Sequence, residues 1–154
     1  MTLKIFHAEE AHLDPLAQLF DAYRVFYGQP SDFHAARHFI FYRLMNDDSV
    51  IFLATEGGKE DEPLGFVQLY PSFSSVAMDS IWILNDLYVK PKARRQGVAK
   101  KLIEQCVQLC KDRGDHKLVL ETQTTNTDAK ALYDKMGFKL DKEFDHYSLA
   151  ASKV

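Results

Sequence analysis

The feature that most constrains the fold is a strand–helix–strand pattern in the second half of the chain. Residues 80–90 are rich in β-branched and aromatic side chains, which favours a strand. Helical periodicity runs from residue 98 to residue 113 and stops at Gly114, a residue type that often follows a helix end. A second strand is predicted at 117–123. Strands joined by a helix normally form a right-handed parallel unit, so this segment predicts a sheet covered by helices.

The remaining segments extend this pattern. A polar stretch from Glu56 to Pro63 predicts an exposed hairpin loop between two strands. The other predicted elements are strands at 3–7, 49–55, 64–70 and 138–149, and helices that begin near Leu13, at 33–45 and at 128–136. We therefore expect an α/β fold (mixed, α+β-like) with a central mixed, twisted sheet of about 6–7 strands and about four helices. The length of 154 residues suits a single domain over residues 1–154.

Composition excludes several classes of protein. A net charge of −3 argues against nucleic-acid binding, and no apolar run approaches the ~20 residues of a membrane span. No secretory leader is visible, so we expect a cytoplasmic protein with neither nucleic-acid nor membrane partners. Cys106 and Cys110 fall on an apolar helix face and are interpreted as packing residues. His34 and His38 share a helix face, but without a third ligand we expect no metal site.

The segment from Lys90 to Lys101 has the character of an anion site. It contains six basic residues and no acidic one, in a chain whose net charge is negative. Gly97, where the next helix opens, has no Cβ and would let a ligand approach the backbone. The first amides of a helix have no intrahelical acceptor, so a diphosphate would fit here. The alternative interpretation is an ordinary strand–helix turn with a solvated basic loop.

A second informative segment runs from Asn126 to Phe138. Thr127 or Asp128 could cap a short helix there, and the helix has an apolar face. Tyr133 lies on this helix. Judged by itself, Tyr133 is most simply a packing aromatic.

Taken together, the two segments resemble the GNAT superfamily of acetyl-CoA-dependent N-acetyltransferases. The resemblance rests on the pattern Arg94-x-x-Gly97-x-Ala99 after a strand, followed by Asn126 and by Leu132-Tyr133-x-x-x-Gly137-Phe138. Residues 84–89 and the Tyr133 helix are similar to the diamine and small histone–polyamine acetyltransferases. Two positions depart from the pattern: Ala99 stands where Gly is usual, and Asn85 stands where diamine acetyltransferases carry a glutamate.

The resemblance implies acetyl-CoA as co-substrate and a set of residues that bind it. Leu87 and Val89 would present backbone groups to the pantetheine arm, with the Val89 amide close to the thioester carbonyl. Tyr133 would stand near the sulfur. The full set implied to contact acetyl-CoA is Leu87, Tyr88, Val89, Arg94, Arg95, Gln96, Gly97, Val98, Ala99, Lys100, Asn126 and Tyr133.

Acetyl transfer to an amine needs a base for the amine proton and an acid for the departing thiolate. Asp86 is our candidate base and Tyr133 our candidate acid, with Glu121 as a reserve base. Strand alternation places Asp86 on the face opposite Asn85 and Leu87, so without a β-bulge Asp86 would be structural.

The acceptor pocket is expected near the first helices and the end of the third predicted strand. Its candidate residues are Tyr23, Tyr27, Tyr70, Asn85 and Glu121, with Phe26 and Asp32 nearby. Core packing is the alternative for the aromatic residues.

The predicted activity is transfer of an acetyl group from acetyl-CoA to a primary amine of a polyamine-like or amino-acid-like small molecule, by direct attack in a ternary complex. The alternatives are a protein-lysine or N-terminal acetyltransferase and a non-catalytic acyl-CoA-binding module. An exposed final strand would suit a homodimer.

Overall fold

The computed structural model describes residues 2–57 and 62–153, and its contacts divide the chain into two compact units, Met1–Glu121 and Thr122–Val154. The prediction of a single domain over residues 1–154 stays a prediction. The middle of the predicted loop between Glu56 and Pro63, residues 58–61, lies outside the described residues.

The first unit contains a five-stranded mixed sheet. Its strands, in spatial order, are β1 (Leu3–His7), β2 (Val50–Glu56), β3 (Pro63–Ser74), β4 (Asp79–Val89) and β5 (Lys117–Leu120). The pairs β1–β2, β2–β3 and β3–β4 are antiparallel, whereas β5 runs parallel to β4. The helix α3 (Val98–Arg113) connects β4 to β5. The parallel strand–helix–strand unit predicted from the sequence is therefore confirmed.

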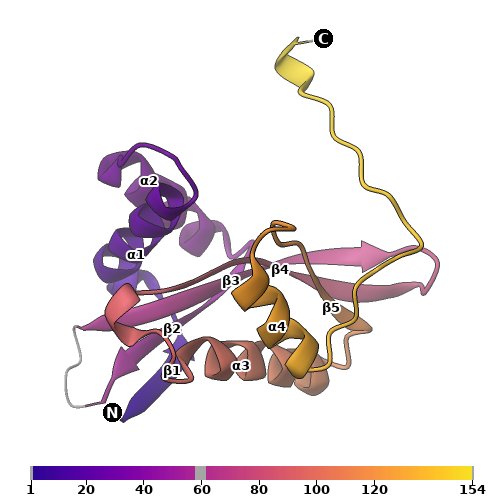
Figure 1. Ribbon diagram of the computed structural model, residues 1–154. Coiled ribbons are helices and arrows are strands. Elements are labelled where there is room, and N and C mark those ends of the chain that lie inside the picture. Colours follow the sequence, from indigo (N-terminus) through magenta and orange to yellow (C-terminus); the bar gives the residue numbers. More distant parts are fainter. Residues whose placement is uncertain (1, 58–61, 154) are drawn as a thin grey trace. The chain divides into compact units, whose positions relative to one another are not determined.

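Helices α1 (Leu13–Phe26) and α2 (Phe33–Asn46) cover one face of this sheet (Figure 1). The α1 residues that point to the sheet recur at helical spacing, which is why this segment folds as a helix when it buries them. The Asp32 side chain begins α2 by accepting a hydrogen bond from the Ala35 amide at 3.1 Å. The core on this face consists of Ala8, Leu13, Leu16, Leu19, Phe20, Ala36, Ile40, Ile51, Leu53, Phe66 and Tyr88.

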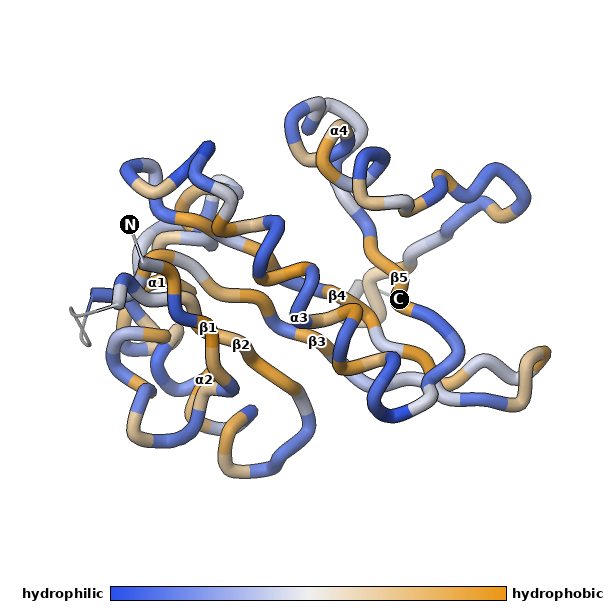
Figure 2. The backbone as a smooth tube through the Cα atoms, turned by 90° about the horizontal axis from the view of Figure 1, so that it is seen from below, coloured by the Kyte–Doolittle hydropathy of each residue, from blue (hydrophilic) through white to orange (hydrophobic). Residues whose placement is uncertain are grey.

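Helix α3 lies on the opposite face of the sheet. Apolar and polar residues alternate along its tube in Figure 2, and the apolar ones form a stripe. The stripe includes Cys106 and Cys110, which are buried free thiols, as expected for packing residues. Burial raises the pKa of the Cys106 thiol to about 12, so it remains a neutral packing group. The helix opens after Gly97 and ends at Gly114, and both glycines have positive φ.

The second unit contains α4 (Thr127–Lys135). Its N-cap is Asn126, whose side chain accepts from the Ala129 amide at 3.4 Å, so the sequence-based choice of Thr127 or Asp128 was wrong. The Asn126 side-chain oxygen, one residue before Thr127, already accepts from the unsatisfied amide at the start of the helix. The Tyr133 ring lies 5.7 Å from that of Phe138.

The sheet is smaller than the predicted 6–7 strands because the predicted strand at 138–149 does not form within the part of the chain that the structure describes. Its apolar residues, such as Leu140 and Phe144, are largely exposed. Alternating apolar residues favour a strand, but a strand forms only where a neighbour satisfies its backbone groups. The homodimer suggested from this strand stays a prediction. No helix in the described residues is long and apolar enough to cross a membrane.

Candidate active site

A β-bulge in the middle of β4 determines where its side chains point. Gln68 on β3 pairs with Asp86, but the next β3 residue, Leu69, pairs with Leu84, so Asn85 is the extra residue. Leu84 is thereby placed with Leu69 on the α3 face, and Asp86 with Gln68 on the α1 face. The β-bulge on which the sequence made a functional Asp86 depend is therefore present, and the catalytic role of Asp86 stays a prediction.

The end of β4 also has an unpaired edge. Strand β5 pairs with β4 only from Ile81 to Leu84. From Asn85 to Val89, no other described strand lies along that edge of β4. The Lys90 amide bonds to Leu64 on β3, and backbone groups alternate along a strand, so the Val89 amide faces the unpaired edge. An extended ligand could add to the sheet here.

Asp86 is buried, with only 5% of its surface exposed, and it is surrounded by hydrogen-bond donors. Gln68 Nε2 donates to Asp86 Oδ2 at 2.7 Å, and Asn85 Nδ2 donates to Oδ1 at 3.1 Å. The Tyr23 phenol of α1 lies close enough that, in addition to burial, the Asp86 charge raises its pKa. A buried carboxylate is tolerated when donors of this kind replace water.

Two tyrosines near Asp86 are held in the protonated form. Burial, reinforced by the Asp86 charge, raises the pKa of Tyr23 well above its usual value. Burial and the same charge raise the pKa of Tyr70 to about 12. At neutral pH both phenols are therefore neutral and able to donate a hydrogen bond.

An aromatic cluster continues from Tyr23 to the exposed end of α1. The rings of Tyr23 and Tyr27 lie 5.1 Å apart in a T-shaped arrangement, so these two residues share a helix face as predicted. Tyr23 also contacts Phe66 in the core, while Tyr27 and Phe26 are exposed. The cluster therefore packs in the core at its Tyr23 end and leaves an accessible aromatic surface at its Tyr27 and Phe26 end.

The remaining acceptor candidates have different positions. Asn85 is exposed at the bulge, and Glu121 is exposed just beyond β5. Asp32 caps α2, where its carboxylate accepts a hydrogen bond, so this carboxylate has a structural role.

The basic loop after β4 begins with a turn in which Arg94 folds back onto the sheet. Arg94 Nε donates to the Val89 carbonyl at 2.9 Å. Its guanidinium lies 5.2 Å from the centre of the Phe26 ring and 5.6 Å from that of Tyr88. The Arg94 side chain therefore fixes the start of the loop against the end of β4.

The rest of the loop leads into the N-terminus of α3. A Cβ on Gly97 would meet nothing within 4 Å, so its surroundings are open. The first intrahelical bond runs from the Lys101 amide to the Gly97 carbonyl at 3.1 Å, which leaves the preceding helix amides for another acceptor. The Val98 side chain is buried, so only its backbone could contact a ligand, and Ala99 is half-buried. Arg95, Gln96 and Lys100 are exposed.

Sequence reasoning missed Gln68 and Ser49. Gln68 is fully buried on β3, and Ser49, just before β2, donates from Oγ to Gln68 Oε1 at 2.9 Å. The available signal was a single polar side chain inside the apolar run of β3, because such a residue must find a buried partner.

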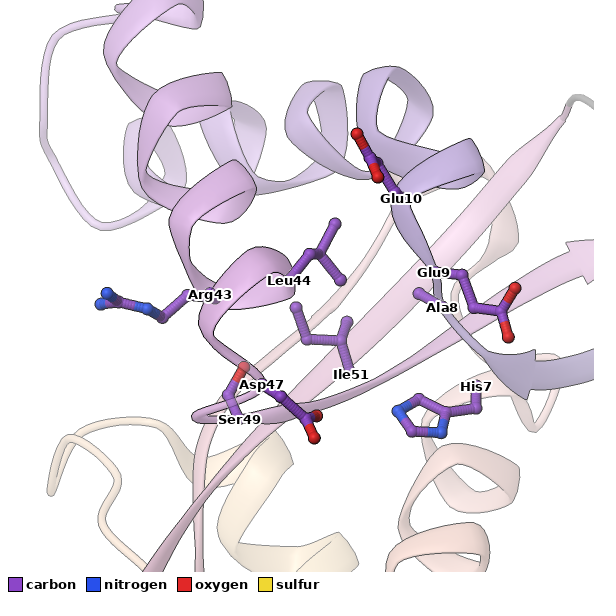
Figure 3. A pocket seen from close by; sticks show the side chains of 9 residues that line it. All are labelled: His7, Ala8, Glu9, Glu10, Arg43, Leu44, Asp47, Ser49 and Ile51. Atoms are coloured by element: carbon purple, nitrogen blue, oxygen red, sulfur yellow. The ribbon is translucent and has the colours of Figure 1, made fainter.

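A cavity of about 270 Å³, lined in part by Ser49, lies between the end of α2 and the first two strands (Figure 3). Leu44 and Ile51 lie between its charged side chains, and Arg43 extends away from Glu9. None of the residues predicted to bind acetyl-CoA or its acceptor lines this cavity. Within the described part of the chain, no group of three or more His, Cys, Asp or Glu side chains is arranged to hold a metal ion.

Comparison with known proteins identifies the family. The model of the acetyltransferase (GNAT) family matches residues 14–138. The Bacillus subtilis (strain 168) protein called "Uncharacterized N-acetyltransferase YhfO" is 42% identical over 147 residues, which are 96% of this chain and 97% of that protein.

Solved structures agree with this match. The crystal structure of a probable acetyltransferase is 42% identical, with a TM-score of 0.89, over 96% of this chain and 97% of the other. The structure of AAC(6')-Iy in complex with the bisubstrate analog CoA-S-monomethyl-acetylneamine is 22% identical, with a TM-score of 0.77, over 98% of this chain and all of the other, and supports the fold alone. The chain therefore belongs to the GNAT family of acetyltransferases, enzymes that use acetyl-CoA as the acetyl donor.

Proposed function

We propose that this acetyltransferase transfers the acetyl group to a primary amine of a cationic small molecule, polyamine-like or amino-acid-like, by direct attack in a ternary complex. The observation that carries the proposal is the buried Asp86 carboxylate, which accepts hydrogen bonds from Gln68 and Asn85 and lies on the strand whose edge is unpaired. The exposed Tyr27 ring beside Tyr23 offers an aromatic surface for a cation.

Acetyl-CoA would lie along the unpaired edge of β4. The backbones of Leu87, Tyr88 and Val89 would pair with the pantetheine arm, and the Val89 amide would donate to the thioester oxygen. This assignment is supported by the missing strand partner along that edge in the described part of the sheet.

The turn from Arg94 to Lys100 would hold the pyrophosphate. Open space at Gly97 and the unsatisfied helix amides after it support this role. Arg94 would contribute by fixing the loop, because its Nε is already bonded to Val89. From the second unit, Asn126 and Tyr133 would contact the pantetheine and the sulfur, an assignment that rests on the family pattern.

The reaction begins with the neutral amine attacking the thioester carbonyl carbon. The new C–N bond forms a tetrahedral intermediate whose oxyanion is stabilised by the Val89 amide. Because Asp86 is buried, the amine proton passes to the Tyr23 hydroxyl while the Tyr23 proton moves to Asp86. The C–S bond then breaks, and Tyr133 protonates the departing thiolate.

An amine panel with acetyl-CoA tests the acceptor class. Spermidine, putrescine, aminoalkyl acids, amino acids and histone-tail peptides would be compared by release of free CoA. Turnover of the small amines is expected. Turnover of peptides alone would replace the small-molecule acceptor with a protein, and CoA binding without turnover would support the non-catalytic module.

Asp86→Asn tests the base. It should lower kcat by roughly 10²–10⁴-fold while acetyl-CoA still binds. Asp79→Asn, an exposed change at the start of the same strand, serves as the control and should leave kcat unchanged. An Asp86→Asn enzyme with full activity would remove Asp86 from the mechanism.

A further inference from the structure

Gln68 is an unusual residue for its position. It is fully buried in β3, in a run where Phe66, Val67 and Leu69 are all fully buried apolar residues. Burying an amide stabilises nothing unless its donors and acceptors are satisfied, so a polar residue here needs a specific partner. Its two side-chain partners are Asp86 and Ser49.

With Asp86 ionised, the contacts of Gln68 select one orientation of its amide. Nε2 donates to Asp86 Oδ2 at 2.7 Å, and Oε1 accepts from Ser49 Oγ at 2.9 Å. The reversed amide would place Oε1 against an ionised carboxylate oxygen, and two acceptors repel. Ser49 is buried beside Gln68, so its hydroxyl holds the amide from the side away from Asp86.

We propose that Gln68, held by Ser49, is a positioning residue that orients the Asp86 carboxylate for proton transfer. This inference rests on the proposed role of Asp86 as the base. Gln68 does not touch the reacting atoms; it acts through Asp86.

The pair also accommodates both protonation states of Asp86. When Asp86 is ionised, the amide donates to it, as observed. When Asp86 has taken up a proton on Oδ2, rotation of the amide lets Oε1 accept from Asp86 while Nε2 donates to the Ser49 oxygen, because a hydroxyl both donates and accepts. In each state the Gln68 amide would keep one hydrogen bond to Asp86 and one to Ser49. A residue that served only to fill space would not have this property.

The central experiment replaces Gln68 with methionine, which has a similar length and no amide. Gln68→Met should lower kcat by roughly 10-fold or more, because a hydrogen bond to the charged group is lost, and should leave the KM for acetyl-CoA within about 2-fold. The matched control is Leu69→Met, the next residue of β3, equally buried but pointing to the opposite face. A volume-conserving change of this kind is well tolerated, so its kcat should match that of the parent.

A double-mutant cycle with Asp86→Asn separates positioning from general damage. If Gln68 acts through Asp86, Gln68→Met should change kcat little in the Asp86→Asn background. An undiminished loss in that background, or a parental kcat in the single Gln68→Met variant, would overturn the proposal. Full activity of Asp86→Asn itself would overturn the base assignment, and the positioning role with it, which distinguishes the two failures.

Ser49 provides a second route if Gln68→Met does not fold. Ser49→Ala removes the hydroxyl that holds the amide and should lower kcat in the same direction, whereas Ser49→Thr keeps a hydroxyl and should restore most of it. Equal kcat values for Ser49→Ala and the parent would contradict the part that we assign to Ser49.

Discussion

Replacing Gly65 with alanine is the sharpest test of the geometry at the end of β4. Gly65 lies on β3 directly opposite Val89, whose amide we assign to the thioester oxygen. A Cβ on Gly65 would lie 2.6 Å from the Tyr88 carbonyl oxygen and 3.2 Å from the Val89 Cα. Both neighbours are backbone atoms, so no flexible side chain can move aside. The strand itself must shift.

The size of the effect follows from these distances. Ordinary contact begins near 3.4 Å, so the end of β4 must move by roughly 0.8 Å. Overpacking of this kind costs about 1–3 kcal/mol, which in a domain of this length lowers Tm by roughly 2–12 °C. A displacement of about 1 Å at a reacting group can lower the rate by roughly 10²-fold. We therefore expect Gly65→Ala to lower both Tm and kcat.

Thermal unfolding and steady-state kinetics on the same samples measure the two effects. Gly114→Ala is the control, because that glycine has φ 72° and nothing within 4 Å of its Cβ position. It should cost about 1–2 kcal/mol of backbone strain and leave kcat unchanged. A Gly65→Ala enzyme with a lower Tm but parental kcat would show that the position of Val89 does not matter for turnover. An unchanged Tm would refute the packing argument itself.

Three further predictions concern other parts of the molecule. Tyr133→Phe should lower kcat by roughly 10²–10⁴-fold and leave acetyl-CoA affinity nearly unchanged; an unchanged kcat, with chemistry shown to limit the rate, would return Tyr133 to a packing role. Gly97→Glu should abolish CoA binding in calorimetry. The control Gly97→Ala shares the backbone strain at φ 81° but adds no charge, so it should still bind CoA. Equal CoA affinity of Gly97→Glu and the parent would place the phosphates elsewhere. The raised pKa values of Cys106 and Tyr70, each about 12, mean that the unfolded chain loses these protons first. Their contribution to the free energy of unfolding is therefore fully present below about pH 9 and is lost between about pH 9 and pH 12. Urea titrations at pH 8 and pH 11 that gave the same free energy of unfolding would contradict this.

Sequence patterns predicted helices and strands well where one face of the element is buried and the pattern that buries it lies within the segment itself. The strand at 3–7 and the helix at 98–113 have the predicted bounds, because apolar spacing and terminal glycines are visible in the sequence itself. The strand at 138–149 was wrong, because its pattern says nothing about whether a partner strand is available. The same limit explains why β5 ends at Leu120 rather than at residue 123.

The candidate site was predicted residue by residue, but not its contacts. Asp86 and Tyr23 were chosen from residue type and position, and the structure places them near enough for the Asp86 charge to add to burial in raising the Tyr23 pKa. Gln68 was not chosen, because its partners lie 18 and 19 residues away in the sequence, and only the register of β3 against its neighbours brings them together. Register depends on turn geometry and on bulges, which are not visible in local periodicity.

The bulge at Asn85 is the step that connects the fold to the chemistry. In a regular strand Leu84 and Asp86, two residues apart, would share a face. Leu84 faces α3, so a regular β4 would bury the Asp86 carboxylate against the apolar stripe of that helix, far from Tyr23 and Gln68. One extra residue places Asp86 on the α1 face, where Gln68 and Asn85 donate hydrogen bonds to it. The same irregularity occurs where β5 stops pairing with β4. A single inserted residue thus places a buried carboxylate among polar partners, at the point where the strand edge along which we propose that acetyl-CoA lies begins.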